Sequence, residues 1–205
     1  MNYPFDTVGL SGDTIDTFDE TYKLLKSRYH TEFTGNIDFH LGDFEVFREC
    51  HDVNVRGSFV IKDALTNCYL LFVEFYKIKK GTYPPTYQDY KYQTWALAYL
   101  KKDFGRILIR RETLADKIIE LVHPVELDFA DDKAFSDTFY VLTNDRWKAE
   151  AAMDRNFRNV VMDMRHEDVL IETTGHTLII GYNQPAMPES SVLLADFVVR
   201  LCSNC

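Results

Sequence analysis

Residues 68–79 read CYLLFVEFYKIK, and this stretch decides the fold class. It is rich in aromatic and β-branched residues, which suit a pleated, half-buried surface. Leu71, Val73 and Phe75 recur at a period of two, so they point to one side of an extended chain. Gly81 and the prolines that follow it end the pattern. The stretch therefore predicts one long β-strand that forms part of a sheet.

On both sides of this stretch, shorter runs show the same alternation of apolar and polar residues. The expected strands span residues 37–41, 44–48, 55–61, 105–111, 125–129, 169–172 and 177–182. Helical segments separate some of them without a strict βαβ order. The sequence therefore predicts an α+β fold, with a mostly antiparallel, twisted sheet and amphipathic helices packed on it.

Apolar residues spaced three and four apart predict the helices. The expected helices span residues 13–29, 113–121, 144–164 and 190–201, with a short helical turn near Phe135. Acidic residues precede basic ones in the first helix, which is the order that suits the helix dipole. In the third, Asn144 is the expected N-cap and Trp147 belongs to the buried stripe.

Residues 90–101 fit both the helical spacing of apolar residues and the two-residue alternation of a strand. Tyr92, Trp95 and Tyr99 form a helical stripe, whereas Trp95, Leu97 and Tyr99 fit one side of a strand. We expect a helix here, and the pattern leaves the strand open as the alternative.

The chain of 205 residues carries a formal net charge of -9. Nucleic acids and anionic membranes attract basic surfaces, and the sequence has no dense run of Lys and Arg, which excludes both as partners. No stretch approaches the roughly 20 apolar residues of a membrane-spanning helix, so we expect no membrane insertion. Residues 1–10 lack the features of a secretory leader. We expect a single domain over residues 1–205, in the cytoplasm, with reduced cysteines.

The most distinctive segment is the tyrosine-rich stretch of residues 82–92, TYPPTYQDYKY. Tyrosine supplies a rigid contact area with one polar group, and binding surfaces favour it. We expect Tyr83, Tyr87 and Tyr90, together with Trp95, to form an exposed aromatic surface for a protein partner or a small ligand. The alternative is a loop that only connects two strands. The segment also contains the P-P-x-Y pattern that WW domains recognise.

Acidic residues form a second candidate site. Glu126 and Asp128 share one side of an expected strand, and Asp131 and Asp132 lie just beyond it. Two positions along a strand are about 6.6 Å apart. That spacing suits a hard cation or a pair of carboxylates around a substrate. A carboxylate- or metal-dependent hydrolase or transferase that uses residues 126–132 is therefore the alternative function. The simpler interpretation is a solvated strand face.

Arg106 and Arg110 fall on one side of another expected strand. A guanidinium group matches planar oxyanions, so the two residues form a candidate anion-binding site. The alternative is that they pair with Glu126 and Asp128 across the sheet.

The C-terminal residues Cys202 and Cys205 form a C-x-x-C pair. The pair follows the last helix, and the negative end of a helix raises the pKa of a thiol rather than lowering it. A zinc site would need further ligands, for which Cys50, His51 or Cys68 are the candidates. We expect a reduced tail, and we expect neither a metal nor a cofactor.

One part of the chain shows a resemblance to a known family. The residues that carry it are Phe104-Gly105-Arg106-Ile107-Leu108-Ile109, Val125-Glu126-Leu127-Asp128-Phe129, Phe135, Phe139-Tyr140-Val141, Asn144-Asp145, Ala151, Phe157, Val169-Leu170-Ile171 and Leu178-Ile179-Ile180. Over residues 104–185 the sequence resembles an uncharacterised bacterial family, domain-of-unknown-function family 3137. The resemblance implies a bacterial α+β module and supplies no reaction and no catalytic residues. Many members of that family carry N-terminal membrane helices, which this sequence lacks.

The sequence contains no H-E-x-x-H, no G-x-S-x-G and no glycine-rich phosphate loop. It is therefore best explained by a non-catalytic binding or scaffolding module that engages a protein partner or a small ligand. A homo-oligomer is compatible with this interpretation.

Overall fold

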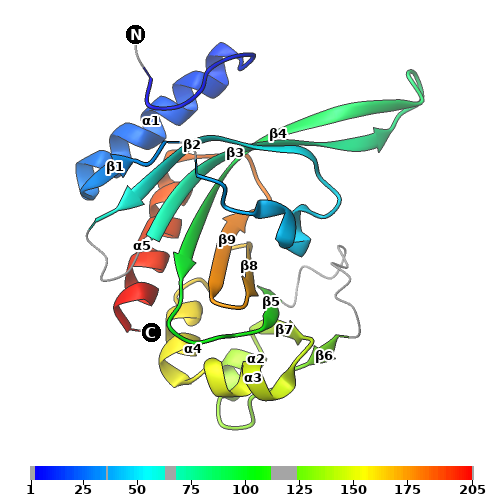
Figure 1. Cartoon of the computed structure of the whole chain (residues 1–205). Coiled ribbons are helices and arrows are strands. Elements are labelled where there is room, and N and C mark those ends of the chain that lie inside the picture. Colours follow the sequence, from blue (N-terminus) through cyan, green and yellow to red (C-terminus); the bar gives the residue numbers. More distant parts are fainter. Residues whose placement is uncertain (1–2, 36, 63–67, 112–123, 205) are drawn as a thin grey trace.

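The chain, described by a computed structural model over residues 3–35, 37–62, 68–111 and 124–204, has an α+β fold (Figure 1). The described residues form one nine-stranded sheet in the order β1-β2-β3-β4-β9-β8-β5-β7-β6, and each neighbouring pair is antiparallel. The predicted fold class is confirmed.

The strands are β1 (Thr31–Phe33), β2 (His51–Ile61), β3 (Cys68–Lys80), β4 (Thr86–Tyr99), β5 (Arg106–Arg111), β6 (Val125–Glu126), β7 (Phe139–Thr143), β8 (Val169–Thr174) and β9 (Thr177–Tyr182). The helices are α1 (Gly12–Arg28), α2 (Lys133–Ser136), α3 (Arg146–Ala152), α4 (Arg155–Met162) and α5 (Pro188–Asn204), with two 3-10 turns, η1 (Leu41–Asp43) and η2 (Glu45–Phe47). The long strand predicted over residues 68–79 is confirmed as β3.

Strand β4 corrects one expectation. The helix expected over residues 90–101 is wrong, because this segment pairs with β3 on one side and β9 on the other. Its side chains are buried on both sheet faces from Gln93 to Ala98. A strand in the middle of a covered sheet buries both faces, and this removes the two-residue alternation that identifies a half-buried strand.

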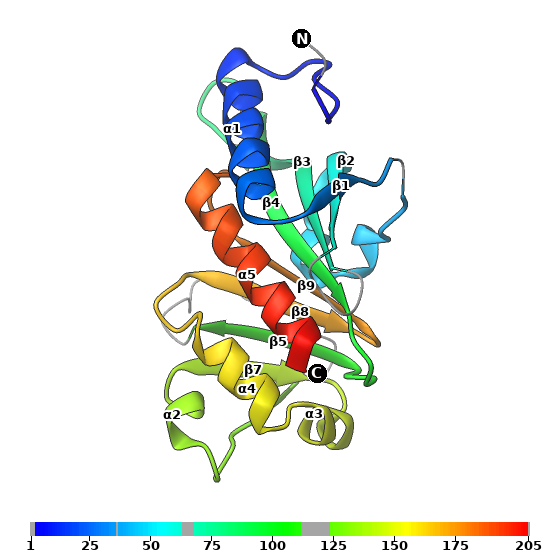
Figure 2. The same ribbon diagram turned by 90° about the vertical axis from the view of Figure 1, so that its left-hand side faces the viewer.

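Helices α1 and α5 cover one face of the sheet and contact each other (Figure 2). In β3 and β4, side chains of even-numbered residues point to this face, which we call the even face. Phe72 of β3 is fully buried there and stacks on Phe18 of α1, with ring centroids 4.3 Å apart. The predicted terminal helices, over residues 13–29 and 190–201, are confirmed.

The opposite, odd face of β3 and β4 is covered by residues 37–50. Their buried side chains are Phe39, Leu41, Phe44 and Phe47, which pack on Leu71, Val73, Phe75 and Trp95. The strands expected over residues 37–41 and 44–48 are wrong. This segment lies on the face of the sheet and makes local 3-10 hydrogen bonds, such as that from the Phe44 N–H to the Leu41 carbonyl.

Residues 144–164 form two helices instead of the single one expected. Asp145 caps α3 and Asp154 caps α4, and each carboxylate accepts a backbone N–H three residues further on, at 3.1 and 3.0 Å. The second cap starts a new helix because a capping residue lies outside the helical conformation. Trp147, expected in the core, is 84% exposed. The helix expected over residues 113–121 lies outside the described residues.

Candidate functional site

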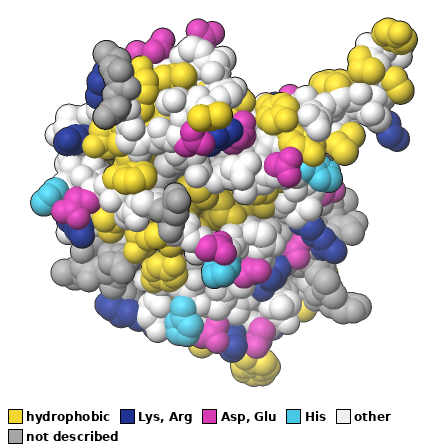
Figure 3. Space-filling view, turned by 45° about the horizontal axis from the view of Figure 1, so that its top comes forward, with side chains coloured by type: hydrophobic (Ala, Val, Ile, Leu, Met, Phe, Trp, Pro, Cys, Tyr) yellow, Lys and Arg dark blue, Asp and Glu magenta, His cyan; other side chains and the backbone are white. Residues whose placement is uncertain are grey.

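The hairpin of β3 and β4 extends beyond the sheet as an arm, which we define as residues 77–91 (Figure 1). Pairing of β3 with β2 stops at Tyr76, and pairing of β4 with β9 begins only at Trp95. Within the described residues, the two arm strands therefore pair with each other alone, up to Lys80 with Thr86. Figure 3 shows the arm leaving the body of the molecule, with apolar side chains at its tip.

Three of the four predicted aromatic residues lie on this arm and are exposed. Tyr83 at the tip is 97% exposed, Tyr87 is 46% exposed and Tyr90 is 48% exposed. Ile78 is 58% exposed on the even face, at a position along the arm between Tyr87 and Tyr90. The apolar surface of the arm is therefore wider than the tyrosines alone.

Trp95, the fourth predicted residue, lies in the core and is 3% exposed. Its ring centroid is 4.9 Å from that of Phe47, and its indole N–H donates to Gln93 at 3.0 Å. Gly181 of β9 gives it room, because a Cβ there would lie 2.4 Å from the ring. The expectation of an exposed Trp95 is wrong. Residues 37–50 cover the odd face and bury this side chain, so it is not available at the surface for binding a partner.

The arm is basic although the protein as a whole is acidic. Lys79 and Lys91 both pair with Asp89, at 2.6 and 3.1 Å, and the hydrogen bond from Lys79 holds the pKa of Asp89 below its ordinary value. Lys77 and Lys80 have no ion pair within the described part of the chain. The arm therefore presents four lysines against one aspartate.

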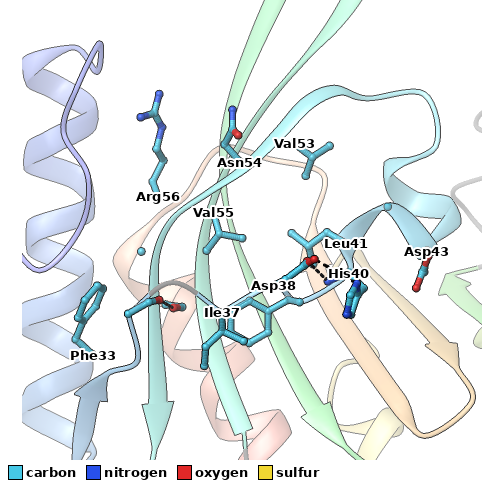
Figure 4. Close-up of a pocket in the computed structure, with 15 residues that line it drawn as sticks. Phe33, Ile37, Asp38, His40, Leu41, Asp43, Val53, Asn54, Val55 and Arg56 are labelled. Atoms are coloured by element: carbon cyan, nitrogen blue, oxygen red, sulfur yellow. Dashed lines mark hydrogen bonds and ion pairs between the residues drawn. The ribbon is translucent and has the colours of Figure 1, made fainter.

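A groove of about 680 Å³ lies between residues 33–43 and β2 (Figure 4). Phe33 and Ile37 supply partly exposed apolar surface in it. At one side, Asp38 faces His40, with the carboxylate 3.4 Å from the imidazole nitrogen Nδ1. The groove is open and is lined by both apolar and polar residues. It was not predicted, because residues 37–41 were expected to form a strand.

The two predicted anion-binding arginines, Arg106 and Arg110, each interact with other parts of the protein. Arg106 pairs with Glu45 at 2.9 Å and donates to the Asp43 carbonyl at 2.9 Å, so its acidic partner comes from η2. Arg110 lies over the ring of Tyr140, 4.6 Å from its centroid. The structure does not bring the two guanidinium groups together on one ligand position.

Glu172 of β8 is a buried acid that the sequence analysis missed. Its side chain is fully buried and accepts the backbone N–H groups of Glu45 and Val46, at 2.9 and 3.0 Å. Burial raises the pKa of Glu172 to about 7, against the opposing effect of these N–H groups and of Arg106. The sequence around Glu172 does not predict that it is buried or that it accepts backbone N–H groups, because the donors, Glu45 and Val46, lie far away along the chain.

The acidic segment 126–132 is held by a buried arginine. Arg158 of α4 pairs with Asp131 at 2.8 Å and with Asp132 at 3.0 Å, and its guanidinium lies over the Phe129 ring. The strand expected over residues 125–129 is shorter than predicted and spans only Val125–Glu126. Within the described residues, no group of three His, Cys, Asp or Glu side chains is arranged to hold a metal ion.

Cys202, expected in a tail after the last helix, belongs to that helix instead. It is buried in α5 next to Cys68 of β3, and the hydrogen bond between the two thiols, together with burial, raises the pKa of Cys68. The Cys68 thiol also approaches the Val198 carbonyl at 3.4 Å. Cys205, the second residue of the C-x-x-C pair, lies outside the described residues.

Comparisons with known proteins show a likeness of fold. No family model matches the sequence, and no curated protein matches it. The structure is similar to the crystal structure of the mycobacterial trehalose monomycolate transport factor A, with a TM-score of 0.56 and 10% sequence identity. The similarity covers 89% of this chain and 90% of that chain, so the two share an overall fold.

None of the described helices has the length and apolar character needed to cross a membrane.

Proposed function

We propose that this protein is a non-catalytic binding module whose arm engages a protein partner. The observation that carries the proposal is the arm itself, a two-stranded hairpin that neither strands nor helices of the described chain cover. An isolated two-stranded hairpin is marginally stable in water. A partner that covers the arm would stabilise it and bury its tyrosines.

The side chains of the arm suit this role. Tyr83, Tyr87 and Tyr90 gather on one projecting element, whereas the exposed Trp147 lies alone on α3. Clustered exposed aromatic groups are typical of interaction sites, and single ones are ordinary surface features. Tyrosine also loses little conformational entropy when a partner orders it.

The charge of the arm indicates the kind of surface that fits it. Its lysines project from a protein with a net charge of -9, so an acidic partner surface with apolar pockets for tyrosine is complementary. The electrostatic part of such binding is screened by salt, so we expect weaker capture as ionic strength rises.

Other observations support a binding role less directly. The fold neighbour is described as a transport factor, a description that names no catalytic reaction. The resemblance of residues 104–185 to domain-of-unknown-function family 3137 stays a prediction. The alternative hydrolase or transferase is less well supported, because Asp131 and Asp132 pair with Arg158. We place the module in the cytoplasm, where the thiols of Cys50, Cys68 and Cys202 would stay reduced.

The proposal is tested by quantitative affinity capture from native lysate with three versions of the chain. We expect the Tyr83→Ala/Tyr87→Ala variant to lose at least about nine-tenths of the partner that the wild type recovers, since such anchors each contribute about 2 kcal/mol or more. Trp147→Ala is the matched control, because it also removes an exposed aromatic ring. Equal recovery by all three chains would exclude the arm as the binding element.

A further inference from the structure

The even face of the arm carries an ordered series of side chains. Cross-strand pairs on this face, read from tip to base, are Lys80 with Thr86, Ile78 with Gln88, Tyr76 with Tyr90, and Glu74 with Tyr92. Side chains two residues apart point to the same side of a strand. The face is therefore basic at the tip, apolar in the middle and acidic at the base.

The base of this face opens into a hollow of about 460 Å³. Asp52, Glu74 and Arg56 line it, together with the rings of Tyr90 and Tyr92. The Arg56 guanidinium is already paired with Glu74 at 2.5 Å and with Asp6 at 2.6 Å. Asp52 has no ion pair in the described part of the chain, so the hollow keeps a net negative charge.

The opposite end of the same face carries the opposite charge. Lys80 is exposed, and no acid of the described residues pairs with it. Lys79, its neighbour, points to the odd face and is neutralised by Asp89. Lys80 and Asp52 thus lie at the two ends of one apolar stripe, with Ile78 at its centre. Neither has an ion-pair partner among the described residues.

A stripe with this order is complementary to itself when a second copy lies antiparallel on it. A two-fold axis through the pair of Ile78 and Gln88 places Lys80 of one copy opposite Tyr76 and Tyr90 of the other. From there a lysine side chain extends toward the hollow and Asp52. Two-fold association of this kind uses the same patch on both copies.

We propose that the even face of the arm binds the same face of a second copy of this chain, with Ile78 at the two-fold axis and Lys80 of each copy directed at the Asp52 hollow of the other. The inference extends the proposed function: it assigns the even face to self-association and leaves Tyr83 and Tyr87, at the tip and on the odd face, for a different protein. The contact involves few residues, and small interfaces belong to weak complexes, so we expect a weak dimer.

Sedimentation velocity over protein concentrations from about 10 µM to about 1 mM tests the proposal, since weak complexes dissociate in this range. We expect wild type to show a reversible monomer–dimer equilibrium. Ile78→Ser and Lys80→Glu should each raise the dissociation constant at least tenfold. Both positions are exposed, so the variants keep their fold. Lys77→Glu, the same charge change on the opposite face, is the matched control and should change it less than twofold.

A mixing experiment identifies the pairing. Asp52→Lys should weaken self-association as Lys80→Glu does. An equimolar mixture of these two variants should recover a heterodimer, because both charged contacts across its interface then join opposite charges. Far-ultraviolet circular dichroism checks that Asp52→Lys is folded, since Asp52 has a positive φ of 49°. Asp52→Asn, which tolerates that φ, serves as the second variant and should also weaken the dimer.

Three results would overturn the inference: a wild type that stays monomeric throughout, equal weakening by Lys77→Glu and Lys80→Glu, or no heterodimer in the mixture. None of them bears on the capture of another protein through Tyr83 and Tyr87. Failure of self-association is therefore distinguishable from failure of the proposed function.

Discussion

The same two strands, β3 and β4, have two different environments along their length. In the body, from Cys68 to Tyr76, β3 has strands on both sides, α1 and α5 over its even face, and the η1–η2 segment over its odd face. In the arm, from Lys77 onward, the same strand has β4 on one side and no other cover from the described residues. Composition changes at the same point, from mainly apolar residues interrupted by Glu74 to a segment rich in lysine and tyrosine.

This difference indicates that the body and the arm contribute differently to the free energy of unfolding. A side chain buried in the body adds to the free energy of unfolding through the apolar area it removes from water. A side chain of the arm stays in water in the isolated chain, so it adds little to that free energy and remains available to a partner. The comparison therefore predicts large effects on stability from substitutions in the body and small ones from substitutions in the arm.

The largest expected effect comes from the even face of the body. Phe72→Ala removes a fully buried ring that stacks on Phe18, so we expect the free energy of unfolding to fall by about 3–5 kcal/mol. Ile78→Ala, three pairs further out on the same face, is the control and should cost less than about 0.5 kcal/mol. Urea unfolding followed by circular dichroism measures both. Similar losses from the two substitutions would contradict the division into body and arm.

A second prediction concerns the cover over the odd face of the body. Glu172 holds η2 by two backbone hydrogen bonds, and its pKa of about 7 in the folded chain exceeds its ordinary value of 4.5. Between these pH values the folded state binds more protons than the unfolded state. The free energy of unfolding therefore falls as pH rises through this window, by on the order of 3 kcal/mol from this group.

Glu172→Gln tests this pH dependence, because glutamine keeps an acceptor for one N–H and does not titrate. Urea unfolding of both proteins at about pH 4 and about pH 7.5 brackets the window. We expect wild type to lose more stability than the variant over that interval. Parallel losses in the two proteins would show that Glu172 does not titrate within it.

Much of the sheet follows from the sequence because its strands are half-buried or strongly apolar. Strands β2, β3, β5, β8 and β9 were each predicted near their observed positions. The failures have physical reasons. Residues 93–98 are buried on both faces of the sheet, so the pattern of residues 90–101 does not distinguish strand from helix. Residues 37–50 alternate like strands but lie across the sheet, where tertiary packing decides their conformation.

The candidate site was predictable only in part. Tyr83, Tyr87 and Tyr90 are exposed beside the proline pair, as expected from residue types that break or border strands. The burial of Trp95 depends on Phe47 and Gly181, which are distant in sequence. The ion-pair partner of Arg106, Glu45, lies 61 residues away along the chain. Contacts of this range leave no local pattern, so residue spacing does not reveal them.

The smallest expected effect is also the most direct test of the central claim, that the arm serves binding and not folding. In a shortened chain, an Asn–Gly turn replaces residues 77–89 and joins Tyr76 to Tyr90, a pair that keeps its place in the sheet. Urea unfolding should give a free energy within about 0.5 kcal/mol of wild type, as for surface changes elsewhere. A loss above about 2 kcal/mol would mean that the arm stabilises the body, and would contradict the account.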